Sequence, residues 1–306
     1  MKYVGLQGQI SKNNRKSILM LMGFPALILA ATYAFVYFLG GYDNIYDINI
    51  IFLETLPFVL IGVAIWFLIA FASHSALIKL STGAKSLERK ENMRIYNLTE
   101  NLCMSVGITM PQLYVIESDA LNAFASGINE KSYAVTLTRG IIETLDDKEL
   151  EGVIAHELTH IRNRDVRLLI ISIIFVGIFG FLVQMILRTL IFGGRGRGNK
   201  KVDGRVMLIA LVIAIVVYIL SILFKFALSR KREYLADAGA VEMTKDPMAM
   251  ASALRKISGN SELELKSDDM KQAFIENGPK KEAVGLSGWF ATHPPIAKRI
   301  EFLEKM

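Results

Sequence analysis

The sequence HELTH, from His156 to His160, lies inside a longer segment, 141–164, whose apolar residues recur at the spacing of an amphipathic α-helix. Residues four positions apart occupy the same face of a helix, so the two imidazoles can bind one metal ion. Glu157 lies one position further around the helix, within reach of a water molecule on that ion. Because the chain has only 4 histidines among 306 residues, about 0.003 chance matches to H-E-x-x-H are expected. We therefore interpret the motif as a metal site.

A catalytic zinc site usually has three protein ligands and one open position, so a further ligand is needed. The other two histidines are His74 and His293, and the single cysteine, Cys103, has no second thiol nearby. His74 ends an apolar stretch and is interpreted as a polar residue at a membrane interface. Carboxylates are the remaining source, and Glu233 and Asp237 stand one helical turn apart in the sequence EYLAD. Glu233 could complete the metal shell while Asp237 accepts the second N–H of a ligating histidine.

Four long stretches are apolar and free of charge. They cover residues 18–39, 55–73, 168–187 and 206–224. About 20 helical residues cross the hydrocarbon core of a bilayer, so each stretch is long enough for a membrane span, and the first is too long for a signal peptide. In the whole chain 52% of residues are apolar and 21% are charged, which excludes a disordered chain, a collagen and a secreted disulfide scaffold.

Charges around the first two stretches set the orientation. Basic residues flank them on the outer sides, whereas the short link between them is acidic. The residues are Lys2, Lys12, Arg15 and Lys16 before the first stretch, Asp43, Asp47 and Glu54 in the link, and Lys79, Lys85, Arg89, Lys90 and Arg94 after the second. The positive-inside rule then places the N-terminus and the chain after residue 79 in the cytoplasm. The net charge of +6 is explained in the same way, and no nucleic-acid partner is expected.

The third and fourth stretches enclose a basic, glycine-rich loop, which conflicts with this rule if both cross the membrane. Three arrangements remain open: a hairpin that crosses twice, a hairpin that enters from one side, and a pair of helices packed on protein. The double crossing is favoured because about 20 uncharged residues are costly to leave in water. A single crossing is excluded, because His160 before the pair and Glu233 after it must lie on the same side.

The remaining segments have the patterns of a small folded domain. Strands are expected at 112–117 and 133–138, and helices at 141–164, 247–257 and 295–304. Asp146 or Asp147 can support the opening turn of the helix that carries HELTH. The segment 259–285 is polar, and we expect an exposed, mobile insert there. The predicted domains are a membrane region (1–79), a domain with a short sheet and the metal helix (80–165), a hydrophobic hairpin (166–228) and a helical part that supplies the third ligand (229–306).

Several motifs in order carry a family resemblance. They are HELTHIRNRD at His156–Asp165, EYLAD at Glu233–Asp237, LNAFASG at Leu121–Gly127, and Thr292-His293-Pro294-Pro295 with Arg299. Together with two leading apolar stretches and a hydrophobic pair before the third ligand, this order resembles the HtpX-type membrane zinc endopeptidases. It is more distantly similar to the type I CAAX prenyl proteases.

The resemblance implies an α-helical polytopic membrane protein with a small α+β zincin domain, of gluzincin-like type, on the cytoplasmic side. It implies one Zn²⁺ per chain held by His156, His160 and Glu233, with Glu157 as the general base. The stretch Asn122, Ala123, Phe124 and Ala125 would be an edge strand that receives an extended substrate, with Asn122 holding a main-chain group. His293 would help to stabilise the oxyanion, with Arg299 supporting that wall, although His293 could also simply begin a helix. Asp165 would be equally explained by a role at a helix end or at the membrane interface.

Spacing along the chain suggests where the site lies. His160 precedes Leu168 by eight residues, about 12 Å of helix, and Glu233 follows Leu228 by five, about 7.5 Å. The site is therefore expected just beneath the cytoplasmic surface of the cell membrane. Its substrates would be membrane proteins or unfolded polypeptides, and the resemblance implies a role in quality control and the stress response.

Two other functions remain open. A prenyl-protein protease would need a roomy chamber within the membrane. Four apolar stretches are few to enclose such a chamber. A non-enzymatic membrane scaffold with a structural metal is disfavoured, because structural zinc sites usually close the fourth position with Cys or His. The sequence does not indicate an oligomeric state.

Overall fold

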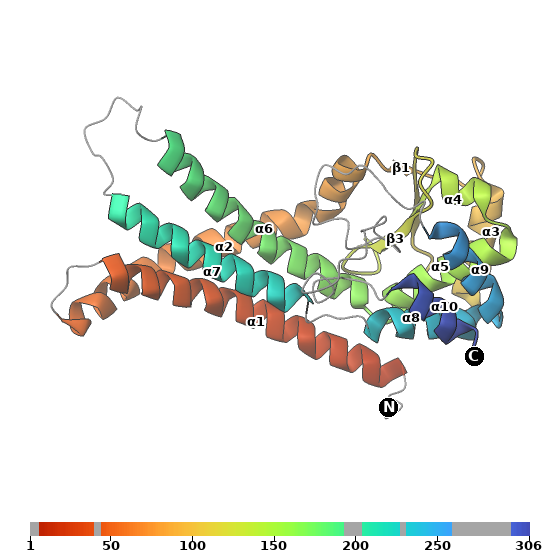
Figure 1. The fold of residues 1–306 in the computed structure, drawn as a ribbon, viewed down its shortest axis with the longest axis horizontal. Helices are drawn as coiled ribbons and strands as arrows, with labels where there is room; N and C mark the ends of the chain where they lie inside the picture. The colour runs from red at the N-terminus through yellow and green to blue at the C-terminus, as the bar shows by residue number, and fades with distance from the viewer. Residues whose placement is uncertain (1–5, 40–43, 193–203, 227–230, 259–294) are drawn as a thin grey trace. The chain divides into compact units, whose positions relative to one another are not determined.

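The computed structural model describes residues 6–39, 44–192, 204–226, 231–258 and 295–306. These residues form two compact units (Figure 1). The helical unit comprises residues 16–72 and 171–227, and the sheet-containing unit comprises residues 1–15, 73–170 and 228–306. The expected insert at 259–285 and His293 lie outside the described residues. The division into four domains remains a prediction.

Four long helices supply the helical unit. They are α1 (Leu6–Leu39), α2 (Ile45–Thr82), α6 (Asp165–Phe192) and α7 (Gly204–Phe226). Each contains one of the four predicted apolar stretches. Within the described residues, α2 and the Asp165–Met185 part of α6 are long and apolar enough to cross a membrane, and α1 and α7 contain shorter apolar segments, Met22–Phe38 and Leu208–Leu220.

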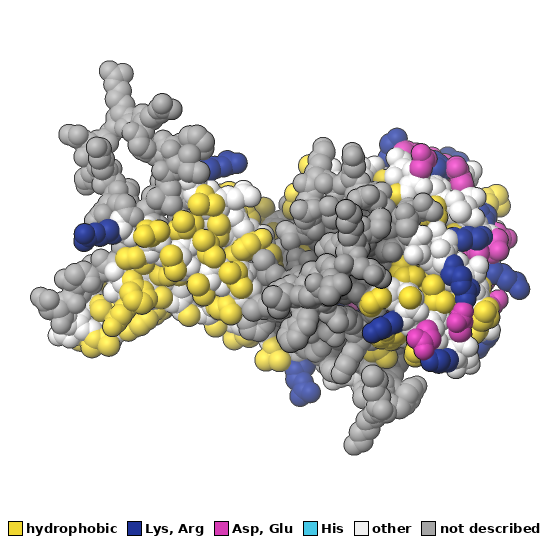
Figure 2. Space-filling model, in the orientation of Figure 1, with side chains coloured by type: hydrophobic (Ala, Val, Ile, Leu, Met, Phe, Trp, Pro, Cys, Tyr) yellow, Lys and Arg dark blue, Asp and Glu magenta, His cyan; other side chains and the backbone are white. Residues whose placement is uncertain are grey.

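Aromatic packing holds the helical unit together. The ring of Phe175 on α6 stacks on that of Phe24 on α1, with centroids 4.4 Å apart, and lies 5.4 Å from that of Phe67 on α2. The outward side chains of this unit are also apolar, for example Phe58, which is 76% exposed. On the face drawn in Figure 2, hydrophobic side chains cover the helical unit, whereas charged side chains are interspersed over the sheet-containing unit. An apolar surface of this kind is typical of an interaction surface or of helices that face lipid.

The other unit is built on a four-stranded sheet of order β1-β2-β4-β3. Its strands are β1 (Lys85–Ser86), β2 (Gln112–Ile116), β3 (Ala123–Ser126) and β4 (Ala134–Thr138). β2 and β4 are parallel, and the other two pairs are antiparallel. The strands expected at 112–117 and 133–138 are present to within one residue. β3 is shifted by one residue from the expected strand at Asn122–Ala125, and it is the last strand on its side of the sheet. The two-residue strand β1 was not predicted.

The helix expected at 141–164 is wrong as a single element. The structure has α4 (Arg139–Thr144) and α5 (Asp147–Arg162), separated by Leu145 in an extended conformation. The break is stabilised by a capping box, because the side chain of Asp146 accepts the N–H of Glu149 while the Glu149 carboxylate accepts the N–H of Asp146. Asp146 is thus the N-cap that starts the metal helix.

Helices α3 (Met93–Val106), α8 (Lys231–Thr244), α9 (Pro247–Ile257) and α10 (Ile296–Leu303) complete this unit. Helix α5 lies inside this unit, because most of its residues are buried, with Leu150, Ile154 and Leu158 fully so. α8 approaches α5 closely at Gly239, where an added Cβ would lie 2.4 Å from Cγ2 of Thr159. Only a residue without a side chain fits there, so the glycine allows the middle of α8 to pack closely on the metal helix.

Candidate metal centre

The HELTH residues lie on the buried helix α5. His156 and Glu157 are 1% and 2% exposed, and His160 is half-buried. The two imidazole rings lie edge to face with centroids 4.8 Å apart, as expected for residues one helical turn apart.

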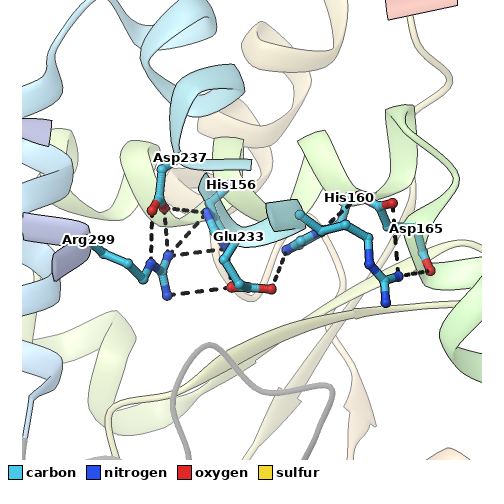
Figure 3. Close-up of polar contacts among 7 residues, drawn as sticks. His156, His160, Asp165, Glu233, Asp237 and Arg299 are labelled. Atoms are coloured by element: carbon cyan, nitrogen blue, oxygen red, sulfur yellow. Dashed lines mark hydrogen bonds and ion pairs between the residues drawn. The ribbon is translucent and has the colours of Figure 1, made fainter. Parts of the chain in front are cut away.

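Glu233 reaches these imidazoles from the first turn of α8 (Figure 3). Its Oε2 lies 3.7 Å from Nε2 of His156, and its Oε1 lies 3.7 Å from Nε2 of His160. One ligand atom from each of the three side chains can be chosen so that all lie within 4.8 Å of one another. Two ligands of a tetrahedral zinc ion, each about 2.1 Å from the metal, are about 3.4 Å apart. Two imidazoles and one carboxylate at this spacing fit a divalent cation with an open fourth position.

Asp237, one turn after Glu233, lies behind His156. Its Oδ1 is 3.0 Å from Nδ1 of His156, which leaves Nε2 directed toward Glu233. Burial and the Arg299 guanidinium lower the pKa of His156, but the nearby carboxylates of Asp237 and Glu233 outweigh them and raise this pKa to about 9. Burial raises the pKa of Asp237, but Arg299 and His156 more than offset this and hold it below its usual value. The predicted contact between Asp237 and a HELTH histidine is therefore present.

Arg299 was expected to support a substrate-binding wall near His293, which lies outside the described residues. In the structure Arg299 is 0% exposed and forms a bidentate pair with Asp237. Its Nη1 also lies 3.6 Å from Oε2 of Glu233. Arg299 therefore holds the two carboxylates of α8 behind the metal position.

A second carboxylate, Asp165, lies behind the other imidazole (Figure 3). Its Oδ2 is 3.4 Å from Nδ1 of His160. Sequence reasoning left the role of Asp165 open and did not find this contact. The signal was a carboxylate five residues after the second histidine, where Arg164, between α5 and α6, adopts a left-handed conformation with φ 59°.

The side chain of Glu157 extends from α5 toward strand β3. The backbone of Ala125 on β3 lies near its carboxylate. Burial raises the pKa of Glu157, and although His156, His160 and the Ala125 backbone oppose the shift, the pKa stays above its usual value. A carboxylate that is more basic than usual is a better proton acceptor.

The expected substrate strand is buried from Asn122 to Ala125. Oδ1 of Asn122 accepts the N–H of Ala123 at 2.9 Å, and the N–H of Asn122 donates to Oγ1 of Thr138 at 3.0 Å. These bonds fix the start of β3. The contact of Ala125 with Glu157 places the strand beside the HELTH helix.

Comparisons with known proteins cover the whole of this site. A model of peptidase family M48 matches residues 89–306. A protease HtpX homolog from Bacteroides fragilis is 52% identical, with 100% of both chains covered. Another from Listeria monocytogenes is 37% identical over 97% of this chain and 99% of its own.

A solved structure shares the fold. The crystal structure of S. mikatae Ste24p matches 96% of this chain with a TM-score of 0.50 and 19% identity, and this chain spans 66% of its length. At this identity the match concerns the fold alone. The resemblance to the HtpX-type proteases expected from the motifs is confirmed by the first two comparisons.

Proposed function

Because the chain belongs to peptidase family M48 and is a metalloprotease, we propose that it hydrolyses peptide bonds at one zinc ion held by His156, His160 and Glu233. The observation that carries this assignment is the convergence of these three side chains, from two helices, to within 4.8 Å. An open fourth position distinguishes such a set from a structural zinc site.

Zinc at this position would supply Lewis acidity, which acidifies water and polarises a peptide carbonyl. Glu157 takes the proton of the attacking water and returns a proton to the leaving amine. Its burial and its raised pKa support this role, because the carboxylate is then basic enough to accept a proton. Asp237 and Arg299 hold His156 in the tautomer that presents Nε2. His293 is proposed to donate to the oxyanion.

The substrate is proposed to bind as an extended segment along β3, with Asn122, Ala123, Phe124 and Ala125 as its contact residues. The proposal is supported by the place of β3 at the end of the sheet and by the closeness of the Ala125 backbone to the Glu157 carboxylate. A segment must be unfolded to add as a strand. The proposed substrates are therefore misfolded or damaged membrane proteins and unfolded polypeptides, whose removal is quality control.

The proposed location is the cell membrane, with four crossings and with the N-terminus and the active site in the cytoplasm. Support comes from the length and composition of α2 and α6 and from the basic residues that flank the first two apolar stretches.

Glu157→Gln in the purified full chain tests the function. We expect one zinc per chain in both wild type and variant, casein cleavage by the wild type that stops on chelation, and no cleavage by the variant. Glu151→Gln, on the same helix but away from the metal position, is the matched control and should cleave normally. Cleavage by the Glu157→Gln protein, or a wild type that binds no metal, would reject the proposed mechanism.

A further inference from the structure

The two histidines of the metal position have the same kind of support. His156 contacts Asp237 at 3.0 Å, and Asp237 is paired with Arg299. His160 contacts Asp165 at 3.4 Å, and Nη1 of Arg232 donates to the backbone oxygen of Asp165 at 3.3 Å and lies 4.0 Å from its Oδ1. Each imidazole thus contacts an aspartate, and each aspartate in turn contacts an arginine.

Asp165 is built into the sheet-containing unit rather than placed on its surface. It is 4% exposed and is the first residue of α6. A carboxylate in the first turn of a helix is stabilised by the free backbone N–H groups there, which favours the charged form of Asp165 beside His160. A fixed carboxylate behind an imidazole sets the orientation of that ring.

Arg232 connects this aspartate to the third ligand. It directly precedes Glu233 on α8, and its side chain is only 17% exposed. Its contacts with Asp165 join the residue that starts α6 to the helix turn that carries Glu233. Asp165 and Arg232 also bracket the hydrophobic pair of helices in the sequence, so their contact closes a loop of 66 intervening residues, 166–231.

We propose that Asp165 and Arg232 are positioning residues of the metal site, in which Asp165 orients His160 and Arg232 ties Glu233 to the same carboxylate. Neither residue touches the substrate. The inference rests on the proposed ligand set of His156, His160 and Glu233.

The test measures zinc affinity of the full chain in detergent, by competition with a chromophoric chelator. Asp165→Asn keeps the shape of the side chain but removes its charge, and Arg232→Gln breaks the link to α8. Loss of such support typically weakens metal binding about 10–100-fold, and we expect this for Asp165→Asn. If Arg232 acts through Asp165, the double variant should bind zinc no more weakly than Asp165→Asn alone.

Arg162→Gln is the matched control. Arg162 also joins α5 to α8, through Glu242 at 3.5 Å, but this pair does not contact a ligand. The control should bind zinc as the wild type does. Arg232→Lys keeps the charge and should recover affinity relative to Arg232→Gln.

Two further readouts separate positioning from folding. The thermal midpoint of metal-free Asp165→Asn is measured first, because the change removes a buried carboxylate, and the increase in midpoint on adding zinc should be smaller for Asp165→Asn than for Arg162→Gln. In the zinc-saturated protein, kcat should fall and KM for peptide should stay unchanged. Equal zinc affinity of Asp165→Asn and Arg162→Gln would overturn the inference, as would a loss of affinity matched by an equal loss of metal-free stability. A wild type without zinc affinity would instead overturn the proposed function.

Discussion

Arg299 and Asp237 form a bidentate ion pair, with Nε 2.9 Å from Oδ2 and Nη2 2.6 Å from Oδ1, in which neither side chain is exposed. The pair joins α10 to α8, and the same aspartate contacts His156. A buried pair of this kind is costly to break, because the remaining charge has no compensation. It therefore links the stability of the C-terminal helix to the geometry of the metal position.

Replacing Arg299 by Met should destabilise the protein. Asp237 would be left as a buried charge, so we expect a loss of about 3–5 kcal/mol in the free energy of unfolding. Denaturant titration in excess chelator measures this without a contribution from bound metal. Arg255→Met is the control, because Arg255 also pairs with a residue near the end of α10, Glu304, but at the surface. That change should cost less than about 1 kcal/mol, and equal losses for the two variants would contradict the prediction.

Gly239→Ala should weaken the packing of α8 on α5. The new Cβ would lie 2.4 Å from Cγ2 and 2.7 Å from Oγ1 of Thr159, and overpacking of this kind costs about 1–3 kcal/mol. The thermal midpoint should fall, and zinc affinity should fall with it because α8 carries Glu233.

A second substitution checks the cause of that loss. Thr159→Ala removes both clashing atoms, so the double variant should be more stable than Gly239→Ala alone. Gly62→Ala in α2, where nothing lies within 4 Å of the new Cβ, should not lower the midpoint. A double variant as unstable as Gly239→Ala would show that the clash with Thr159 is not responsible.

The Glu149 carboxylate should make the free energy of unfolding depend on pH in the acidic range. It accepts hydrogen bonds from Lys256 at 2.6 Å and Ser252 at 2.7 Å. Burial raises the pKa of Glu149, but these bonds outweigh it and lower the pKa below its usual value. A lowered folded-state pKa means that the stabilisation is complete above the unfolded pKa of about 4.3 and is lost as the pH falls through the folded pKa.

Glu149→Gln should therefore be less stable than the wild type at pH 7, and the difference should shrink as the pH falls below about 4. Burial followed by the charges of Asp246 and Asp147 raises the pKa of Glu151 on the same helix, so Glu151→Gln should not destabilise at pH 7. Unfolding titrations at a series of pH values measure both. A stability difference for Glu149→Gln that is constant with pH would be inconsistent with the lowered pKa.

Removal of the metal should lower the thermal midpoint. A ligand at 100 times its dissociation constant stabilises the folded state by about 2.7 kcal/mol, so chelation should remove at least this much from a tightly bound site. Glu233→Ala lacks one ligand and should respond much less to chelator. An equal response in wild type and Glu233→Ala would place the bound metal elsewhere.

The residues that touch the metal position could be predicted because their chemistry is local in sequence. HELTH fixes its own geometry through the helical repeat, and the scarcity of histidine directed attention to Glu233. The break between α4 and α5 could not be predicted in the same way, because Ile142 and Leu145 continue the apolar pattern of the metal helix although the backbone turns at Leu145. The contacts of two charged residues, Arg299 and Asp165, were also not predicted. Their burial depends on partners far away in sequence, which no spacing rule identifies.

The 72 residues between His160 and Glu233 include both α6 and α7. A nascent chain therefore carries both imidazoles and the proposed base, Glu157, well before it carries Glu233, the proposed third ligand. During that interval the ribosome still has to produce the two most apolar helices of the second half. During its synthesis the polypeptide therefore lacks the complete proposed site, which can form only after both hydrophobic helices have been made.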